Sequence, residues 1–269
     1  MVAFVGDKKD SIFKAVSEMY TDVARHPGRQ FHFPTGRPAC LFVGYPKAQL
    51  DAIPETAVES FAGVGYPFAV GAIQQGDWVL DIGSGSGTDV LIASTLVGPC
   101  GKVYGLDMTE AMLAKARANA KKMGASHVEL VNGNAEAIPL PDASIDSVTS
   151  NGVLNLVPDK PRAFAEIYRV LRPGGRIQIA DIVLGRPIKA ESRNDPQLWA
   201  ECIVGAVQEE DYLALFRAAG FKNVTHRDRR VGLFLQERGR RYPGGGCKVR
   251  GENRRDLRHQ ADLTHGRVP

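Results

Sequence analysis

Apolar positions recur along this chain with two different spacings, which separate predicted helices from predicted strands. In residues 10–25 they recur every three or four positions, which predicts an amphipathic helix. Its apolar stripe is Ile12, Phe13, Val16, Met19, Tyr20 and Val23. Residues 30–65 follow neither spacing and are rich in Pro, Gly and aromatic residues, so we expect an irregular segment. It is too long to be an idle connection, which indicates a role near the substrate.

Short apolar runs alternate with helical patterns from residue 78 to residue 182. Such alternation predicts parallel strands joined by crossover helices. The expected fold is therefore α/β: a doubly wound, Rossmann-like, mostly parallel sheet with helices on both faces, and an N-terminal cap helix and loop. Residues 194–220 are predicted to be helical and to end in a last helix over 209–219. Residues 224–230 and 231–236 read as the start of a closing hairpin.

Three glycines at alternate positions, Gly83, Gly85 and Gly87, follow the predicted strand 78–82. A strand that ends in a glycine-rich turn before a helix is typical of nucleotide sites in open α/β sheets. The spacing G-x-G-x-G differs from the dinucleotide pattern G-x-G-x-x-G. Asp81, two residues before the first glycine, would repel a pyrophosphate and would suit a cation, such as the amino group of an amino-acid-like ligand.

A second strand, predicted over 102–107, ends at Asp107, about twenty residues beyond the glycines. A carboxylate at that distance can accept hydrogen bonds from both hydroxyls of a ribose. The alternative is that Asp107 caps the helix predicted over 109–123, since Asp is favoured at helix starts. We favour the ribose interpretation because the glycine loop lies upstream.

Together these motifs resemble the class I S-adenosylmethionine-dependent methyltransferases. Further matching segments are 132–136 (after the third strand), 144–151 (the fourth strand) and 170–177 (before the fifth). The resemblance implies S-adenosyl-L-methionine as cofactor. It also implies that the cofactor is bound by the following residues: Tyr20, Asp81, Gly83, Gly85, Gly87, Asp107, Met108, Asn134, Ala135, Glu136 and Asn151.

Several segments outside this core, among them 31–37 and 201–206, resemble the arsenite methyltransferase branch. That family supplies cysteines in three places, and thiolates suit a soft centre such as trivalent arsenic. Only the third place keeps its cysteine here, as Cys202, while the other two read Gly63-Val64-Gly65 and Asn151-Gly152-Val153. Cys202 is either a remaining ligand or a small buried apolar residue. One thiol cannot chelate arsenic, which favours another small-molecule acceptor.

Three functions compete: a small-molecule methyltransferase, an arsenite methyltransferase that uses Cys202 with another thiol, and a non-catalytic binding module. The intact glycine loop and both aspartates argue against the third. Methyl transfer needs alignment more than proton transfer, so few catalytic residues are expected. His32 is the candidate general base, and its alternative role is to anchor its own loop by a hydrogen bond. His32 and Cys202 are the catalytic candidates.

Length and composition suit one α/β domain with additions. The chain has 269 residues, of which 43% are hydrophobic, enough for a full core. Neither a membrane-spanning run nor a signal-peptide apolar stretch is predicted. The four cysteines lack metal-site spacing, so we expect no metal. The default is a cytoplasmic, reduced protein with a small-molecule substrate and no membrane partner, whose oligomeric state the sequence leaves open.

The formal net charge of +4 is unevenly distributed. Beyond residue 236 there are nine Lys or Arg and four acidic residues, so this part carries +5 and the part before it −1. Without aromatic interleaving or apolar periodicity, these basic residues read as a disordered extension, and nucleic-acid binding is unlikely. A shifted reading frame would also produce this change in composition. The expected organisation is an N-terminal cap and substrate-side segment (1–70), a cofactor-binding domain (71–236) and a basic tail (237–269).

Overall fold

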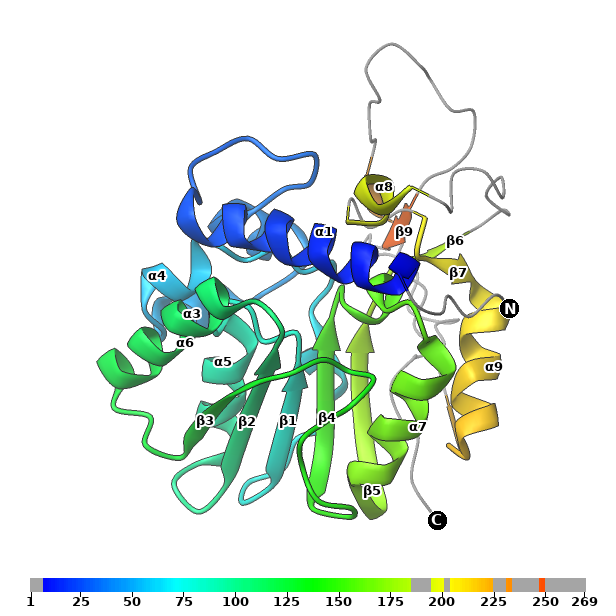
Figure 1. Ribbon diagram of the computed structural model, residues 1–269. Helices are drawn as coiled ribbons and strands as arrows, with labels where there is room; N and C mark the ends of the chain where they lie inside the picture. Colours follow the sequence, from blue (N-terminus) through cyan, green and yellow to red (C-terminus); the bar gives the residue numbers. More distant parts are fainter. Residues whose placement is uncertain (1–6, 185–194, 201–203, 225–230, 234–246, 250–269) are drawn as a thin grey trace, which may run out of the picture.

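A computed structural model describes residues 7–184, 195–200, 204–224, 231–233 and 247–249. At its centre lies a five-stranded sheet in the order β3-β2-β1-β4-β5, with every neighbouring pair parallel (Figure 1). The strands are β1 (Trp78–Ile82), β2 (Lys102–Asp107), β3 (Val128–Asn132), β4 (Ile145–Asn151) and β5 (Leu171–Ala180). The order reverses beside β1, which confirms the predicted doubly wound architecture.

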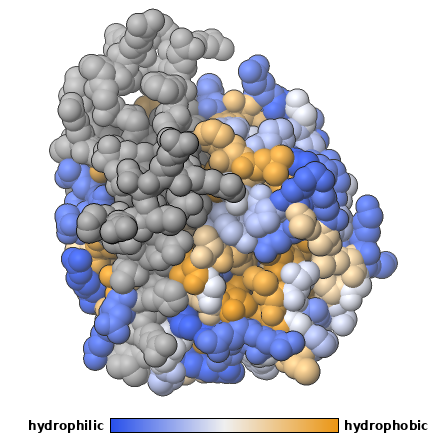
Figure 2. Space-filling view, turned by 180° about the vertical axis from the view of Figure 1, so that it is seen from behind, coloured by the Kyte–Doolittle hydropathy of each residue, from blue (hydrophilic) through white to orange (hydrophobic). Residues whose placement is uncertain are grey.

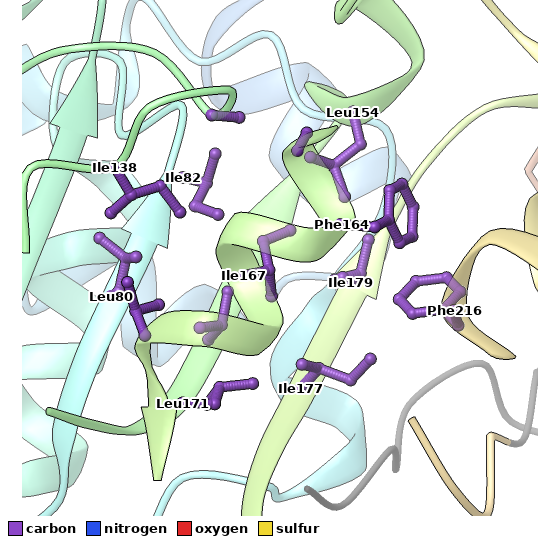
Figure 3. Packing of buried hydrophobic residues seen from close by; sticks show 14 of the residues in the cluster. Leu80, Ile82, Ile138, Leu154, Phe164, Ile167, Leu171, Ile177, Ile179 and Phe216 are labelled. Atoms are coloured by element: carbon purple, nitrogen blue, oxygen red, sulfur yellow. The ribbon is translucent and has the colours of Figure 1, made fainter. Parts of the chain in front are cut away.

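Helices cover both faces of this sheet, as predicted. Helices α5 (Thr88–Val97) and α6 (Glu110–Met123) cover one face, and Val79 and Val103 of the strands pack toward them. Helices α7 (Lys160–Val170) and α9 (Glu209–Ala219) cover the other, above Leu80, Ile177 and their neighbours (Figure 3). Because successive strand residues point to opposite faces, one short apolar run such as 78–82 contributes to both cores.

The N-terminal helix α1 (Asp7–Arg25) crosses the edge of the sheet at which the strands end (Figure 1). Its apolar stripe packs with Trp199 of α8 (Pro196–Ala200) and with Val64 and Leu156. The prediction of a helix that caps the sheet is therefore confirmed.

The segment predicted to be irregular contains three short helices, and that prediction is wrong in this respect. They are α2 (Gly36–Phe42), α3 (Lys47–Asp51) and α4 (Glu55–Val58), followed by the 3-10 turn η1 (Pro67–Val70). Helices of four to seven residues are too short to show a clear apolar period. Pro46 and Pro54 stand at the N-caps of α3 and α4, so two of the prolines that suggested an irregular segment mark helix starts.

The predicted hairpin of 224–230 and 231–236 lies largely outside the described residues, so it stays a prediction. A second sheet has the order β7-β6-β9-β8, built from β6 (Val183–Leu184), β7 (Val207–Gln208), β8 (Val231–Leu233) and β9 (Cys247–Val249). Strand β8 pairs with β9, whereas 225–230 lie outside the described residues. Strand β9 belongs to the range predicted as a disordered tail, and its Cys247 is registered with Leu184. The domain boundaries themselves stay a prediction.

The described surface is mixed. Figure 2 shows several apolar areas among hydrophilic side chains on the face opposite to Figure 1. Leu41, Phe42, Trp78 and Leu96 are the large apolar residues that are exposed. Within the described ranges, none of the helices has the length and apolar character needed to cross a membrane.

Candidate functional site

A cavity opens at the carboxyl ends of β1, β2 and β4, beneath α1. This is where open α/β sheets bind their ligands. It encloses about 970 Å³ of space between protein atoms, part of it open to solvent. Its lining comes from residues within 13–20, 60–63, 81–89, 106–112, 133–135 and 151–157.

The glycine loop forms the floor of the cavity between β1 and α5. Gly83, Gly85 and Gly87 have φ angles of +74°, +52° and +97°, a left-handed region that favours glycine. The amides of Gly83 and Ser84 donate to the carbonyl of Leu106, at 2.7 and 3.0 Å, so the loop is tied to β2. A Cβ on Gly83 would lie 2.1 Å from Val153, which shows how closely the segment after β4 approaches.

Three carboxyl groups face this cavity: Asp81, Asp89 and Asp107. Asp81 is only 2% exposed, and its Oδ2 atom has no hydrogen-bond partner among the described residues. Burial, followed by the nearby Asp89 and Asp107, raises the pKa of Asp81 well above its ordinary value. Burial also raises the pKa of Asp89 to about 6. Among the described residues, the lining contains no Lys, Arg or His, so this part of the cavity favours a positively charged ligand.

Asp107 ends β2 with both oxygens in backbone hydrogen bonds. Its Oδ2 accepts from the amide of Gly85 and its Oδ1 from that of Thr109, each at 2.8 Å. Burial raises the pKa of Asp107. The residue at the N-cap of α6 is Thr109, so Asp107 lies two residues before the cap. Each oxygen keeps a further lone pair for a ligand hydroxyl.

The structure brings most of the predicted cofactor residues together. The lining includes Tyr20, Asp81, Gly83, Gly85, Asp107, Met108, Asn134, Ala135 and Asn151. They come from α1, from the loops after β1, β2 and β3, and from the end of β4. Residues far apart in sequence meet because parallel strands all end at the same edge of a sheet.

Three predicted site residues lie outside the lining, and a fourth is not among the described residues. Gly87 is the N-cap of α5 and is outside the lining. Glu136 is 3% exposed, forms an ion pair with Lys9 and accepts a 2.8 Å hydrogen bond from the amide of Asp159. Its carboxylate is thus engaged in holding α1 and the start of α7 rather than in lining the cavity. His32 is exposed and outside the lining, and Cys202 lies outside the described residues.

Sequence reasoning missed Asp89 and the apolar wall. Asp89 stands in the first turn of α5, a helix whose other buried members are mostly apolar. An acidic residue in a helix that is otherwise mostly apolar could have indicated a functional role for Asp89. Phe13, Val16, Phe61 and Leu156 also line the cavity. They resemble ordinary core residues in sequence, so only the packing of α1 over the sheet reveals them.

The two cysteines whose side chains are described, Cys40 and Cys100, do not line this cavity. Cys40 is fully buried in the core on the α5 face, and Cys100 is exposed in the turn before β2. Burial, followed by Asp89, raises the pKa of the Cys40 thiol, which disfavours the thiolate that binds soft centres.

Comparisons with known proteins agree with this geometry. Residues 73–220 match the model of a family described as a methyltransferase domain. The arsenite methyltransferase of Halobacterium salinarum is 44% identical over 162 residues, which are 60% of this chain and 41% of that protein. For the human arsenite methyltransferase the identity is 38% over 153 residues, 54% of this chain and 41% of that protein. The chain therefore spans about two fifths of the length of these relatives.

A shorter relative and a solved structure extend the comparison. The ubiquinone/menaquinone biosynthesis C-methyltransferase of Escherichia coli is 31% identical over 191 residues, 63% of this chain and 76% of that protein. The crystal structure of an arsenic(III) S-adenosylmethionine methyltransferase from Chlamydomonas reinhardtii superposes with a TM-score of 0.56 at 35% identity. That alignment covers 74% of this chain and 64% of the other.

Proposed function

Because the chain belongs to the methyltransferase-domain family, we propose that it transfers a methyl group from S-adenosylmethionine to a small-molecule acceptor. The observation that carries this proposal is the buried Oδ2 of Asp81, which has no hydrogen-bond partner in the described part of the chain. The cavity around it presents three carboxyl groups and, from the described residues, no cationic side chain. Such a cavity suits a ligand with an ammonium and a sulfonium group, and it disfavours a pyrophosphate.

The proposed binding roles follow from chemistry. Asp81 would pair with the ammonium group, and Asp107 would accept hydrogen bonds from the ribose hydroxyls. Met108, Asn134 and Ala135 would surround the adenine. Bound S-adenosylmethionine supplies an electrophilic methyl group on its sulfonium sulfur. The chain's part is to align the acceptor and exclude water, which the apolar residues of α1 above the site favour.

We expect the acceptor to be apolar on one side and to carry a nucleophile that needs no general base. Phe13, Val16, Phe61 and Leu156 give the cavity an apolar wall. No histidine of the described residues lines the cavity, and its carboxyl groups are buried beside the proposed cofactor site. A thiolate, an amine or an enolised carbon fits this setting better than a hydroxyl. His32 and Cys202 stay catalytic candidates whose participation is a proposal.

Replacement of Asp107 by alanine tests the cofactor assignment. We expect Asp107→Ala to weaken S-adenosylmethionine binding by about 1–3 kcal/mol, since hydrogen bonds to a charged group are lost. Calorimetric titration measures this change. Glu129→Ala is the matched control, because Glu129 is an exposed acid on the neighbouring strand. Equal affinity of the Asp107 variant and the wild type would remove Asp107 from the site.

Arsenite methylation is the second candidate function, favoured by the names of the relatives. Two positions that hold cysteines in that branch meet in space here without thiols. A Cβ on Gly152 would lie 3.1 Å from a methyl group of Val64. Gly152 also has a φ angle of +73°, which strains any other residue.

We therefore expect little or no methylated arsenic from the purified protein with S-adenosylmethionine, glutathione and arsenite. Product analysis by chromatography with elemental detection measures the yield. The control is an authentic arsenite methyltransferase assayed in parallel. Robust turnover that Cys202→Ser abolishes would instead establish arsenite as the substrate.

We also propose that the protein acts in a reducing, cytoplasmic compartment. Cys40 and Cys100 are free thiols, as expected in such a compartment. Fluorescence microscopy of a tagged full chain tests this location.

A further inference from the structure

We propose that Asp89 and Tyr45 are positioning residues, which hold the side chain of Asn151 in the turn 63–65 and so fix one wall of the cavity. This inference goes beyond the proposed methyl transfer, because it concerns the wall of the cavity rather than the chemistry within it. Gly63 of this turn lines the cavity, as do Phe61 and Ala62 directly before it.

Asn151 grips the turn through its side-chain amide. Its Oδ1 accepts hydrogen bonds from the backbone amides of Val64 at 2.8 Å and of Gly65 at 3.1 Å. Its Nδ2 donates to the carbonyl of Gly65 at 3.0 Å. The amide thereby acts like one residue of a neighbouring strand, although the turn and β4 are 86 residues apart.

Asp89 and Tyr45 decide how Asn151 is oriented. The Nδ2 of Asn151 lies 3.1 Å from Asp89 Oδ2 and 2.9 Å from the Tyr45 hydroxyl. The Tyr45 hydroxyl donates in turn to Asp89 Oδ1. Because these two acceptors and the carbonyl of Gly65 face one end of the amide, its nitrogen must lie at that end. Its oxygen then faces the backbone amides of Val64 and Gly65. A flipped amide would place oxygen against oxygen.

The glycines of the turn permit this contact. A Cβ on Gly63 would lie 2.5 Å from Asn151 Nδ2, and one on Gly65 would lie 2.6 Å from the Cβ of Ala180. Both distances are too short for a real side chain. The two glycines therefore allow close approach of the turn to β4 and β5, not flexibility.

The orientation depends on the charge of Asp89. An ionised Asp89 accepts from both neighbours, whereas a protonated one must donate and competes with the Tyr45 hydroxyl or with Asn151. The groups that face Asp89 are Tyr45 and Cys40 from the segment 36–45, Asp81 from β1 and Asn151 from β4. Since burial raises the pKa of Asp89 to about 6, the hydrogen bonds between Asn151 and the turn 63–65 should weaken below that pH.

Amide hydrogen exchange at Val64 and Gly65 tests the proposal directly, and it needs no acceptor and no turnover. In the full chain at pH 7.5, we expect Tyr45→Phe to reduce protection of these two amides about fivefold, as one lost hydrogen bond would. Asp89→Asn should reduce it about tenfold, because the new amide presents a donor to Asn151. Exchange of the β1 amides should not accelerate in either variant.

Tyr66→Phe is the matched control. It removes a hydroxyl from the same aromatic cluster, where the Tyr66 hydroxyl donates to Gln49 at 2.9 Å. We expect wild-type protection at Val64 and Gly65 in this variant.

A pH series separates positioning from general stability. Protection factors of Val64 and Gly65 in the wild type should fall as the pH drops through about 6, and Asp89→Asn should abolish this step. The proposal is overturned if both Tyr45→Phe and Asp89→Asn keep wild-type protection, or if Tyr66→Phe loosens the turn equally. A wild type without a pH step would also overturn the role of Asp89. None of these outcomes depends on S-adenosylmethionine, so they are independent of the proposed function.

Discussion

The variant Asp81→Asn should bind S-adenosylmethionine 100-fold or more weakly than the wild type, a loss on the order of 3 kcal/mol. Its free energy of unfolding without ligand should nevertheless be higher than that of the wild type. The two effects have one cause. Asp81 is almost fully buried, its Oδ2 has no described partner, and it faces two further carboxyl groups. Without a ligand its charge is unfavourable, and with a bound ammonium group it becomes the principal electrostatic contact.

Two measurements on one sample check this prediction. Calorimetry gives the affinity, and chemical unfolding of the ligand-free protein gives the free energy of unfolding. We expect that free energy to rise by about 1–2 kcal/mol at pH 7, the scale for removal of one unpaired buried charge. Glu129→Gln, on an exposed acid that pairs with Lys102 away from the cavity, should leave the affinity unchanged. An Asn variant that binds as tightly as the wild type would remove Asp81 from the cofactor site.

The second large effect is a pH dependence of opposite sign with and without ligand. Burial raises the pKa values of Asp81, Asp89 and Asp107 in the folded protein. For a carboxyl whose folded pKa is raised, the folded state binds protons more readily than the unfolded state. These three groups should therefore make the ligand-free protein less stable as the pH rises from about 4 through 6.

Affinity for S-adenosylmethionine should change in the other direction. A cationic ligand binds the ionised carboxylates, so affinity should rise about tenfold or more between pH 5 and 7.5, with proton release on binding. Calorimetry in buffers of different ionisation enthalpy measures both. S-adenosylhomocysteine lacks the sulfonium charge and should show a smaller dependence. An affinity independent of pH would contradict the proposed pairing of carboxylates with a cation.

Other acids act in a different pH range. Hydrogen bonds from Arg169 lower the pKa of Glu166, and one from Lys47 lowers that of Asp51. Groups with lowered pKa values stabilise the folded state above their unfolded pKa and lose that contribution as the pH falls. Their effect lies below about pH 4.5, beneath the range of the cavity carboxyls.

The central sheet and the glycine loop on the floor of the cavity follow from local features of the sequence. The run 78–82, the glycines at 83, 85 and 87 and the acid at 107 are local features. A strand that breaks into glycines before a helix allows few conformations, and parallel strands must end at one edge. For that reason the sequence alone predicts one site that contains Asp81, Gly83, Gly85 and Asp107.

Which other side chains reach the cavity depends on tertiary contacts between distant segments of the chain. Glu136 belongs to a matching motif, yet Lys9 and Asp159 engage it, because α1 lies directly above it. Asp89 and Tyr45 are 44 residues apart and meet through packing of α2 and α3 on α5. Val64 covers Gly152 because Asn151 grips the turn 63–65. Such contacts depend on side chains from distant segments, which local pattern and spacing do not encode, whereas the strand, its glycine turn and its terminal acid are adjacent in the chain.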